Sequence, residues 1–71
     1  MLDQLLPRSN HFSIKHIDHD NQYVLVEDKE LGLEIRLFWG QKELKEAIIV
    51  GPYEIQFIYE DGSTRTIPIL S

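Results

Sequence analysis

The clearest fold signal lies in residues 53–69, YEIQFIYEDGSTRTIPI. Two runs rich in aromatic and β-branched side chains, 53–59 and 64–69, flank the polar segment EDGS at 60–63. Runs of this composition favour extended strands, and an acidic residue followed by glycine favours a tight turn between them. The segment therefore predicts a β-hairpin.

The length of the loop sets the register of this hairpin. A three-residue loop over 60–62, with Gly62 in the left-handed conformation, places Ile55 opposite Ile67 and pairs two apolar side chains. A two-residue loop would instead place Ile55 opposite Pro68. We expect the first register. Because a proline cannot donate to a ladder, we also expect the last strand to lie at a sheet edge.

Period-two alternation and β-branched runs recur through the rest of the chain. In addition to the hairpin, we expect strands over 12–17, 22–27, 31–39 and 47–50. Together these segments predict a mostly β class with about five antiparallel strands in meander order. Such strands commonly curl into a small SH3- or OB-like barrel or form a curved open sheet, and both remain expectations here.

Two short segments have helical spacing or helix-forming residues. Residues 1–10 are expected to form an N-terminal helical turn or tail, ahead of a single small β domain over 11–71. Residues 41–46, QKELKE, are strong helix formers and predict one helical turn, with a turn that leads into a strand as the alternative.

Two of the predicted strands are apolar on both faces. Val24 and Val26 point to one side of their strand while Tyr23 and Leu25 point to the other, and residues 47–50, AIIV, show the same pattern. A strand of this kind requires cover on both faces, which one barrel core cannot supply. The candidate covers are the N-terminal turn with Leu2, Leu5 and Leu6, the helical turn with Leu44, or another chain. We expect a second apolar face that acts as an interface, most simply in a homodimer.

The composition limits the class of protein. The chain has 71 residues, enough for one core, and no cysteine, which excludes disulfides and thiolate metal sites. The net charge is −5 and the seven Lys and Arg residues are scattered, so we expect no direct nucleic-acid binding. No apolar run approaches the roughly 20 residues that cross a bilayer, and we do not expect residues 1–10 to be a secretory signal. We expect no membrane association and a cytoplasmic location.

Residues 11–21, HFSIKHIDHDN, contain all three histidines and two aspartates. Histidine and carboxylate side chains are metal ligands, and the candidate ligands here are His11, His16, Asp18 and His19. We favour a polar turn whose side chains cap backbone amides, and therefore predict no metal site and no cofactor. The sequence has no glycine-rich phosphate loop and no nucleophile with triad context, so we do not predict an enzyme.

Aromatic side chains are the stronger candidates for a binding surface. Phe38 and Trp39 are adjacent on one predicted strand and therefore point to opposite sides, so that Phe38 is exposed if Trp39 joins the core. Exposed aromatic residues are enriched at binding hot spots. The candidate binding surface comprises Phe38, Tyr23, Leu25, Trp39, Tyr53 and Tyr59.

These features favour a small non-catalytic protein–protein interaction module whose partner is another protein, with a homodimer as one form of it. The alternative is a small acidic inhibitor or immunity-type protein that blocks a nucleic-acid enzyme by charge mimicry, and only the net charge supports it. A further alternative is a metal-binding protein that uses the His/Asp cluster.

Overall fold

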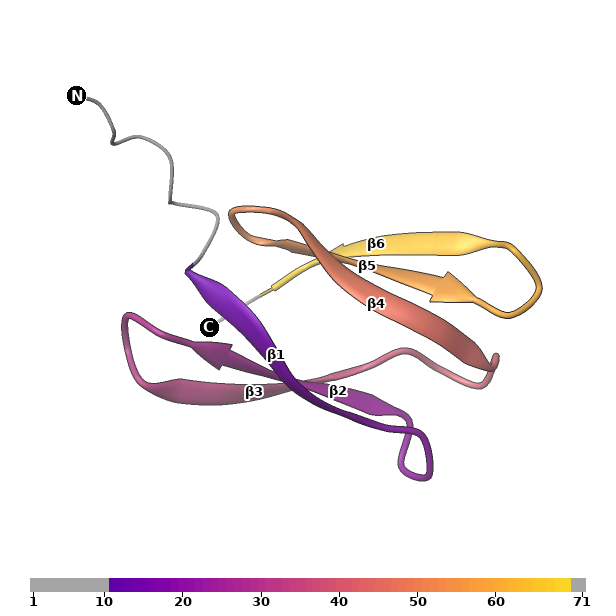
Figure 1. Cartoon of the computed structure of the whole chain (residues 1–71), viewed down its shortest axis with the longest axis horizontal. Coiled ribbons are helices and arrows are strands. Elements are labelled where there is room, and N and C mark those ends of the chain that lie inside the picture. The colour runs from indigo at the N-terminus through magenta and orange to yellow at the C-terminus, as the bar shows by residue number, and fades with distance from the viewer. Residues whose placement is uncertain (1–10, 70–71) are drawn as a thin grey trace.

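The computed structural model describes residues 11–69, and all regular secondary structure in that range is β (Figure 1). The strands, in chain order, are β1 (Phe12–Asp18), β2 (Tyr23–Asp28), β3 (Leu33–Phe38), β4 (Leu44–Gly51), β5 (Glu54–Tyr59) and β6 (Thr64–Pro68). The predicted mostly β class is confirmed. The helical turn or tail predicted for residues 1–10 lies outside the described residues. No helix in the described range is long and apolar enough to span a membrane.

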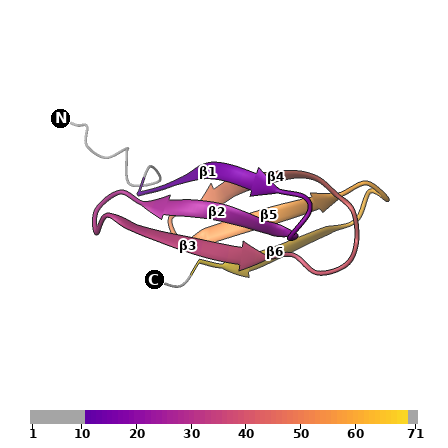
Figure 2. The ribbon, with the colours of Figure 1, turned by 90° about the horizontal axis from the view of Figure 1, so that it is seen from below.

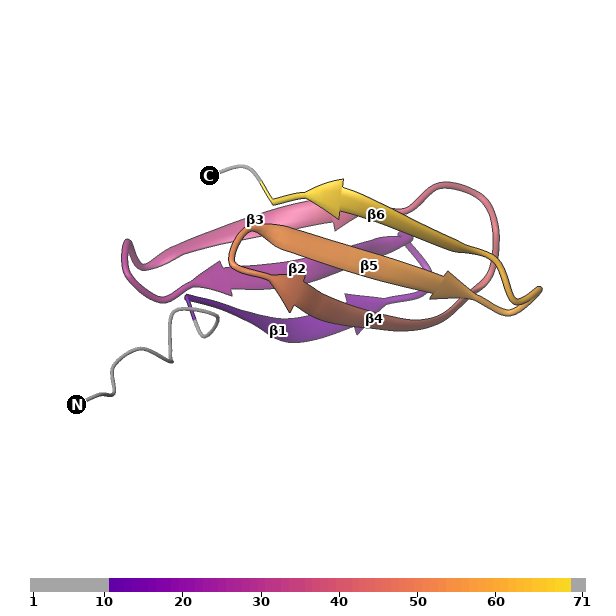
Figure 3. The same ribbon diagram turned by 90° about the horizontal axis from the view of Figure 1, so that it is seen from above.

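The strands form two antiparallel sheets of three, β1–β2–β3 and β4–β5–β6. Figure 2 shows the first sheet in front of the second, and Figure 3 shows the pair from the opposite side, so the sheets are stacked as a sandwich. In both views β1 and β4 lie along one side and β3 and β6 along the other. The barrel prediction is wrong because residues 39–43 carry the chain from one sheet to the other, so β3 and β4 do not pair.

The hydrophobic core lies between the inner faces of the two sheets. Its fully buried apolar side chains come from the central strands, Val24 and Val26 on β2 and Ile55 and Phe57 on β5. The strands β3 and β6 contribute only partly buried apolar side chains to it, Ile35 and Leu37 on β3 and Ile67 on β6.

The C-terminal hairpin forms in the predicted register. Ile55 lies opposite Ile67, and Gly62 has a φ of 91°, in the left-handed region that the three-residue loop requires. The strand that contains Pro68 is one of the two outer strands of its sheet, as expected.

Residues 41–46 do not form the expected helical turn, and the alternative, a turn that leads into a strand, is confirmed. Residues 41–42 form a bend, and β4 begins at Leu44, which pairs with Tyr59 and is buried in the core. The Glu60 amide donates a hydrogen bond to the Glu43 carbonyl at 2.9 Å, which extends this pairing toward the bend. Pairing with β5 and the burial of Leu44 therefore override the helix propensity of the segment.

The sandwich explains the strands that are apolar on both faces. On β2, Val24 and Val26 face the core, whereas Tyr23 and Leu25 lie on the outer face of the sheet and are only partly buried. The second apolar strand, β4, likewise buries Ala47 and leaves part of its apolar side chains outside the core. Among residues 11–69, no further layer covers either outer face.

Candidate functional site

The outer face of the β1–β2–β3 sheet carries a patch formed by Tyr23, Leu25, Arg36 and Phe38, called here the outer patch. Tyr23 and Phe38 are cross-strand partners, and their ring centroids lie 5.5 Å apart in an edge-to-face arrangement. The Arg36 guanidinium lies 5.2 Å from the Tyr23 ring centroid, and Leu25 is the cross-strand partner of Arg36. Phe38 remains 61% exposed, so the patch presents an aromatic ring beside a cation.

A β-bulge in β1 brings two polar side chains to the same face. The register with β2 shifts between Ile14 and His16, so that His16 lies opposite Leu25 and Asp18 opposite Tyr23. Asp18 also closes the β1–β2 turn, because its Oδ1 accepts a hydrogen bond from the Asn21 amide at 3.0 Å. This bond, with a second one from the Asn21 side chain, lowers the pKa of Asp18. The predicted role of this aspartate in capping the turn is confirmed.

The four candidate metal ligands are not gathered in one place. His16 and Asp18 are on the outer face, whereas the ring of His19 contacts the ring of Trp39, with 5.7 Å between centroids. Within the described range, no group of three or more His, Cys, Asp or Glu side chains is placed to hold a metal ion.

His11 belongs to a different cluster, which the sequence analysis missed. Its Nε2 lies 3.0 Å from Oδ1 of the fully buried Asp28, and its Nδ1 lies 3.1 Å from Oε1 of Glu30. Because both nitrogens face carboxylate oxygens, the imidazole can donate to both only when it is protonated. No local pattern marks this cluster, because Asp28, Lys29 and Glu30 have the composition of an ordinary polar turn.

Asp28 closes the β2–β3 turn from inside the sandwich. Its Oδ1 also accepts hydrogen bonds from the amides of Glu30 and Leu31, at 3.0 and 3.1 Å. Burial opposes ionisation of this carboxyl, but the amide bonds and the charge of His11 outweigh it, so the pKa of Asp28 lies below its usual value. Its Oδ2 has no hydrogen-bond partner among the described residues. The cluster therefore anchors the start of β1 to this turn.

Trp39 and Tyr59, predicted as parts of the binding surface, are buried at the end of the sandwich. The Tyr59 hydroxyl donates to the Trp39 carbonyl at 3.1 Å, and Trp39 Nε1 donates to the Lys42 carbonyl at 2.9 Å. These bonds fix the 39–43 linker against β5. Tyr53, which is exposed, contacts the rings of His11 and Phe12 near the β4–β5 turn and does not join the outer patch.

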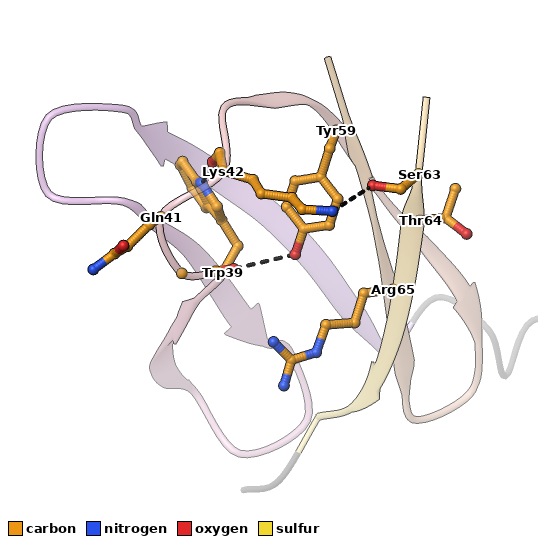
Figure 4. Close-up of a pocket in the computed structure, with 8 residues that line it drawn as sticks. Trp39, Gln41, Lys42, Tyr59, Ser63, Thr64 and Arg65 are labelled. Carbon is orange, nitrogen blue, oxygen red and sulfur yellow. Dashed lines mark hydrogen bonds between the residues drawn. The ribbon is translucent and has the colours of Figure 1, made fainter. Parts of the chain in front are cut away.

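A cleft of about 420 Å³ opens between the linker and the start of β6 (Figure 4). Lys42 Nζ donates to Ser63 Oγ at 3.0 Å and lies 3.3 Å from Asp61 Oδ2, while Ser63 Oγ donates to Asp61 Oδ1 at 2.6 Å. The hydrogen bonds from the Ser63 hydroxyl and amide, together with Lys42, lower the pKa of Asp61 to about 2. The cleft is lined by Trp39, Gly40, Gln41, Lys42, Tyr59, Ser63, Thr64 and Arg65.

A carboxylate with so low a pKa is a weak base. The Lys42–Ser63–Asp61 contacts tie the β5–β6 turn to the linker.

Comparisons with protein-family models, with curated protein sequences and with solved structures gave no match.

Proposed function

We propose that this protein is a non-catalytic protein–protein interaction module that binds its partner through the outer patch. The observation that carries the proposal is Phe38, whose side chain is 61% exposed and whose ring packs in a T-shaped arrangement with the ring of Tyr23. An exposed aromatic side chain beside an arginine is the composition of a binding hot spot, because both residue types are enriched there.

The position of the patch supports the same proposal. Its residues lie on paired strands of a sheet, so their side chains are held in place before a partner arrives, which lowers the entropy lost on binding. The cytoplasm, where we place this cysteine-free chain, would supply a protein partner.

Substitution of Phe38 tests this proposal. The chain provides a matched control, because Leu31 is exposed to almost the same extent, 62%, but lies in the β2–β3 turn. Tagged wild type, Phe38→Asp and Leu31→Asp should be used to capture proteins from a nuclease-treated lysate of the native source. The captured partner should then be purified and titrated against each variant by calorimetry.

We expect one partner to bind wild type and Leu31→Asp equally, and to bind Phe38→Asp about 30-fold more weakly or worse, since a hot-spot residue contributes about 2 kcal/mol or more. Equal binding of the partner by both variants would contradict the proposal. If that binding were also lost at raised salt, it would support the acidic-inhibitor alternative instead.

A further inference from the structure

Each sheet has two outer strands, β1 and β3 in one and β4 and β6 in the other, and the outer edge of each pairs with no strand within residues 11–69. The strands β1 and β4 contact each other and both contain a register shift, so β3 and β6 have the regular outer edges. The hydrogen bonds between β3 and β2 show which backbone amides and carbonyls of β3 point away from β2. The Trp39 amide donates to the Gln22 carbonyl at 3.3 Å and continues the β2–β3 register, so the odd-numbered residues of β3 direct their amides toward β2. The amides and carbonyls of Glu34, Arg36 and Phe38 therefore point outward.

The edge of β6 is protected against the addition of a strand. The Ile69 amide donates to the Tyr53 carbonyl at 2.7 Å, which continues the β5–β6 register and shows that even-numbered residues of β6 point outward. One of these is Pro68, which has no amide hydrogen to offer to an added strand. The strand β3 contains no proline, so its edge can accept another strand.

We propose that β3 from a second copy of this chain pairs antiparallel with this edge, with Ile35 opposite Ile35 of the second copy. In this register Glu34 lies opposite Arg36 of the second copy, and Arg36 opposite its Glu34. Both residues direct their backbone groups outward, so each such pair exchanges both backbone hydrogen bonds. The paired side chains have opposite charge and lie on the same face of the sheet.

The charges around β3 favour this register over its neighbours. Within one chain Glu34 lies opposite Glu27, a like charge, and neither Glu34 nor Arg36 forms an ion pair with another described residue. The second copy would supply the missing opposite charges. A shift to the next register with the same faces would pair Glu34 with Glu34 or Arg36 with Arg36, and an intermediate shift would place apolar side chains opposite charged ones.

The apolar side chains of β3 favour the pairing too. Leu33 points toward the core side of the sheet yet is 48% exposed, and Ile35 and Leu37 are only partly buried. In the proposed register Leu33 lies opposite Leu37 of the second copy, and the two Ile35 side chains meet at the two-fold axis. The pairing therefore removes apolar surface from water that the single sandwich leaves exposed.

The proposed pairing shares Arg36 with the outer patch but is otherwise separate from it, because Glu34 is not part of the patch. It uses the backbone edge and the Glu34 and Arg36 charges, and it joins two sheets into one. The outer patches of the two copies would then lie on one continuous face, which presents two binding surfaces to the same side.

Sedimentation equilibrium of the full chain tests the pairing through charge reversal. Wild type is expected to show a monomer–dimer equilibrium between about 10 µM and about 1 mM, the range of a weak interface. Glu34→Arg gives a chain with two arginines at the edge, and Arg36→Glu a chain with two glutamates. Each alone should raise the dimer dissociation constant about tenfold or more, because repulsive pairs replace attractive ones. An equimolar mixture of the two variants should dimerise again.

Two variants control for net charge. Lys45→Glu and Glu46→Arg alter exposed side chains of β4, and they should leave the dimer unchanged. Circular dichroism checks that every variant is folded. A wild type that stays monomeric, a single charge variant that dimerises like wild type, or a mixture that stays monomeric would each overturn the pairing. A dimer that survives both charge variants but is lost with Phe38→Asp would do so as well, and would assign self-association to the outer patch.

Discussion

Replacement of Val26 by alanine tests which face of β2 is the core face. The Val26 side chain is completely buried between the sheets. The substitution removes two carbons, which costs about 1.6 kcal/mol in transfer free energy. A cavity that does not collapse adds about 1 kcal/mol. The free energy of unfolding should therefore fall by about 2–3 kcal/mol, a large share of the roughly 4–10 kcal/mol expected for a domain of this size.

The assay is a urea titration followed by the fluorescence of Trp39, which is the only tryptophan and is buried. The matched control is Val50→Ala, the same chemical change at a side chain that is 45% exposed. We expect the control to cost less than about 0.5 kcal/mol. Equal losses, or a larger loss at Val50, would refute the stacking of the sheets on this face. In that case Tyr23 and Leu25 would lie on the core face of β2, and the outer patch would be unavailable to a partner.

Three further predictions concern the linker and the C-terminal turn. Tyr59→Phe removes the hydroxyl that donates to the Trp39 carbonyl, and it should lower the free energy of unfolding in urea titrations by about 1 kcal/mol. The control Tyr53→Phe, at an exposed ring, should lower it by less than about 0.5 kcal/mol. Equal losses would argue against the bond. Gly62→Ala should lower the stability seen in thermal melts by about 1 kcal/mol. Backbone strain alone causes this loss, because φ is positive at Gly62 and no atom lies within 4 Å of an added Cβ. An unchanged Tm would contradict the left-handed turn. Hydrogen bonds from Ser63, and then Lys42, lower the pKa of Asp61 from 3.8 to about 2. The ionised Asp61 therefore stabilises the fold above pH 3.8, and this stabilisation is lost as the pH falls toward 2. Asp61→Asn should therefore weaken the dependence of Tm on pH in this window, and a dependence like that of wild type would show that Asp61 does not contribute.

Local sequence was sufficient for the C-terminal hairpin. The register follows from loop length and from pairing Ile55 with Ile67, and both the strands and the turn that it needs lie within residues 53–69. The same holds for the Asp18 turn, whose hydrogen bonds reach only three residues along the chain. In both places the decisive interactions are close in sequence, so the residue pattern contains them.

The outer patch was predicted only in part. Strand alternation indicates that Tyr23 and Leu25 share one face and that Phe38 points away from Trp39. Alternation within single strands does not specify which strands pair, so it could not bring Phe38 beside Tyr23. The sequence-based prediction also placed Trp39, Tyr53 and Tyr59 in the binding surface. The rings of Trp39 and Tyr59 are buried at the linker, and Tyr53 lies at the β4–β5 turn.

By itself the sequence determined the β class, the alternation of each strand and the turns between neighbouring strands, because those depend on residues a few positions apart. Only the tertiary structure decided that two sheets stack instead of closing into a barrel, and that residues 43–46 lie along β5 instead of completing a helical turn. It also decided that Asp28 is buried against His11 and that β3 is left with an unprotected edge. Each of these depends on contacts between segments far apart in the chain, whose burial outweighs the local preferences of the residues that make them.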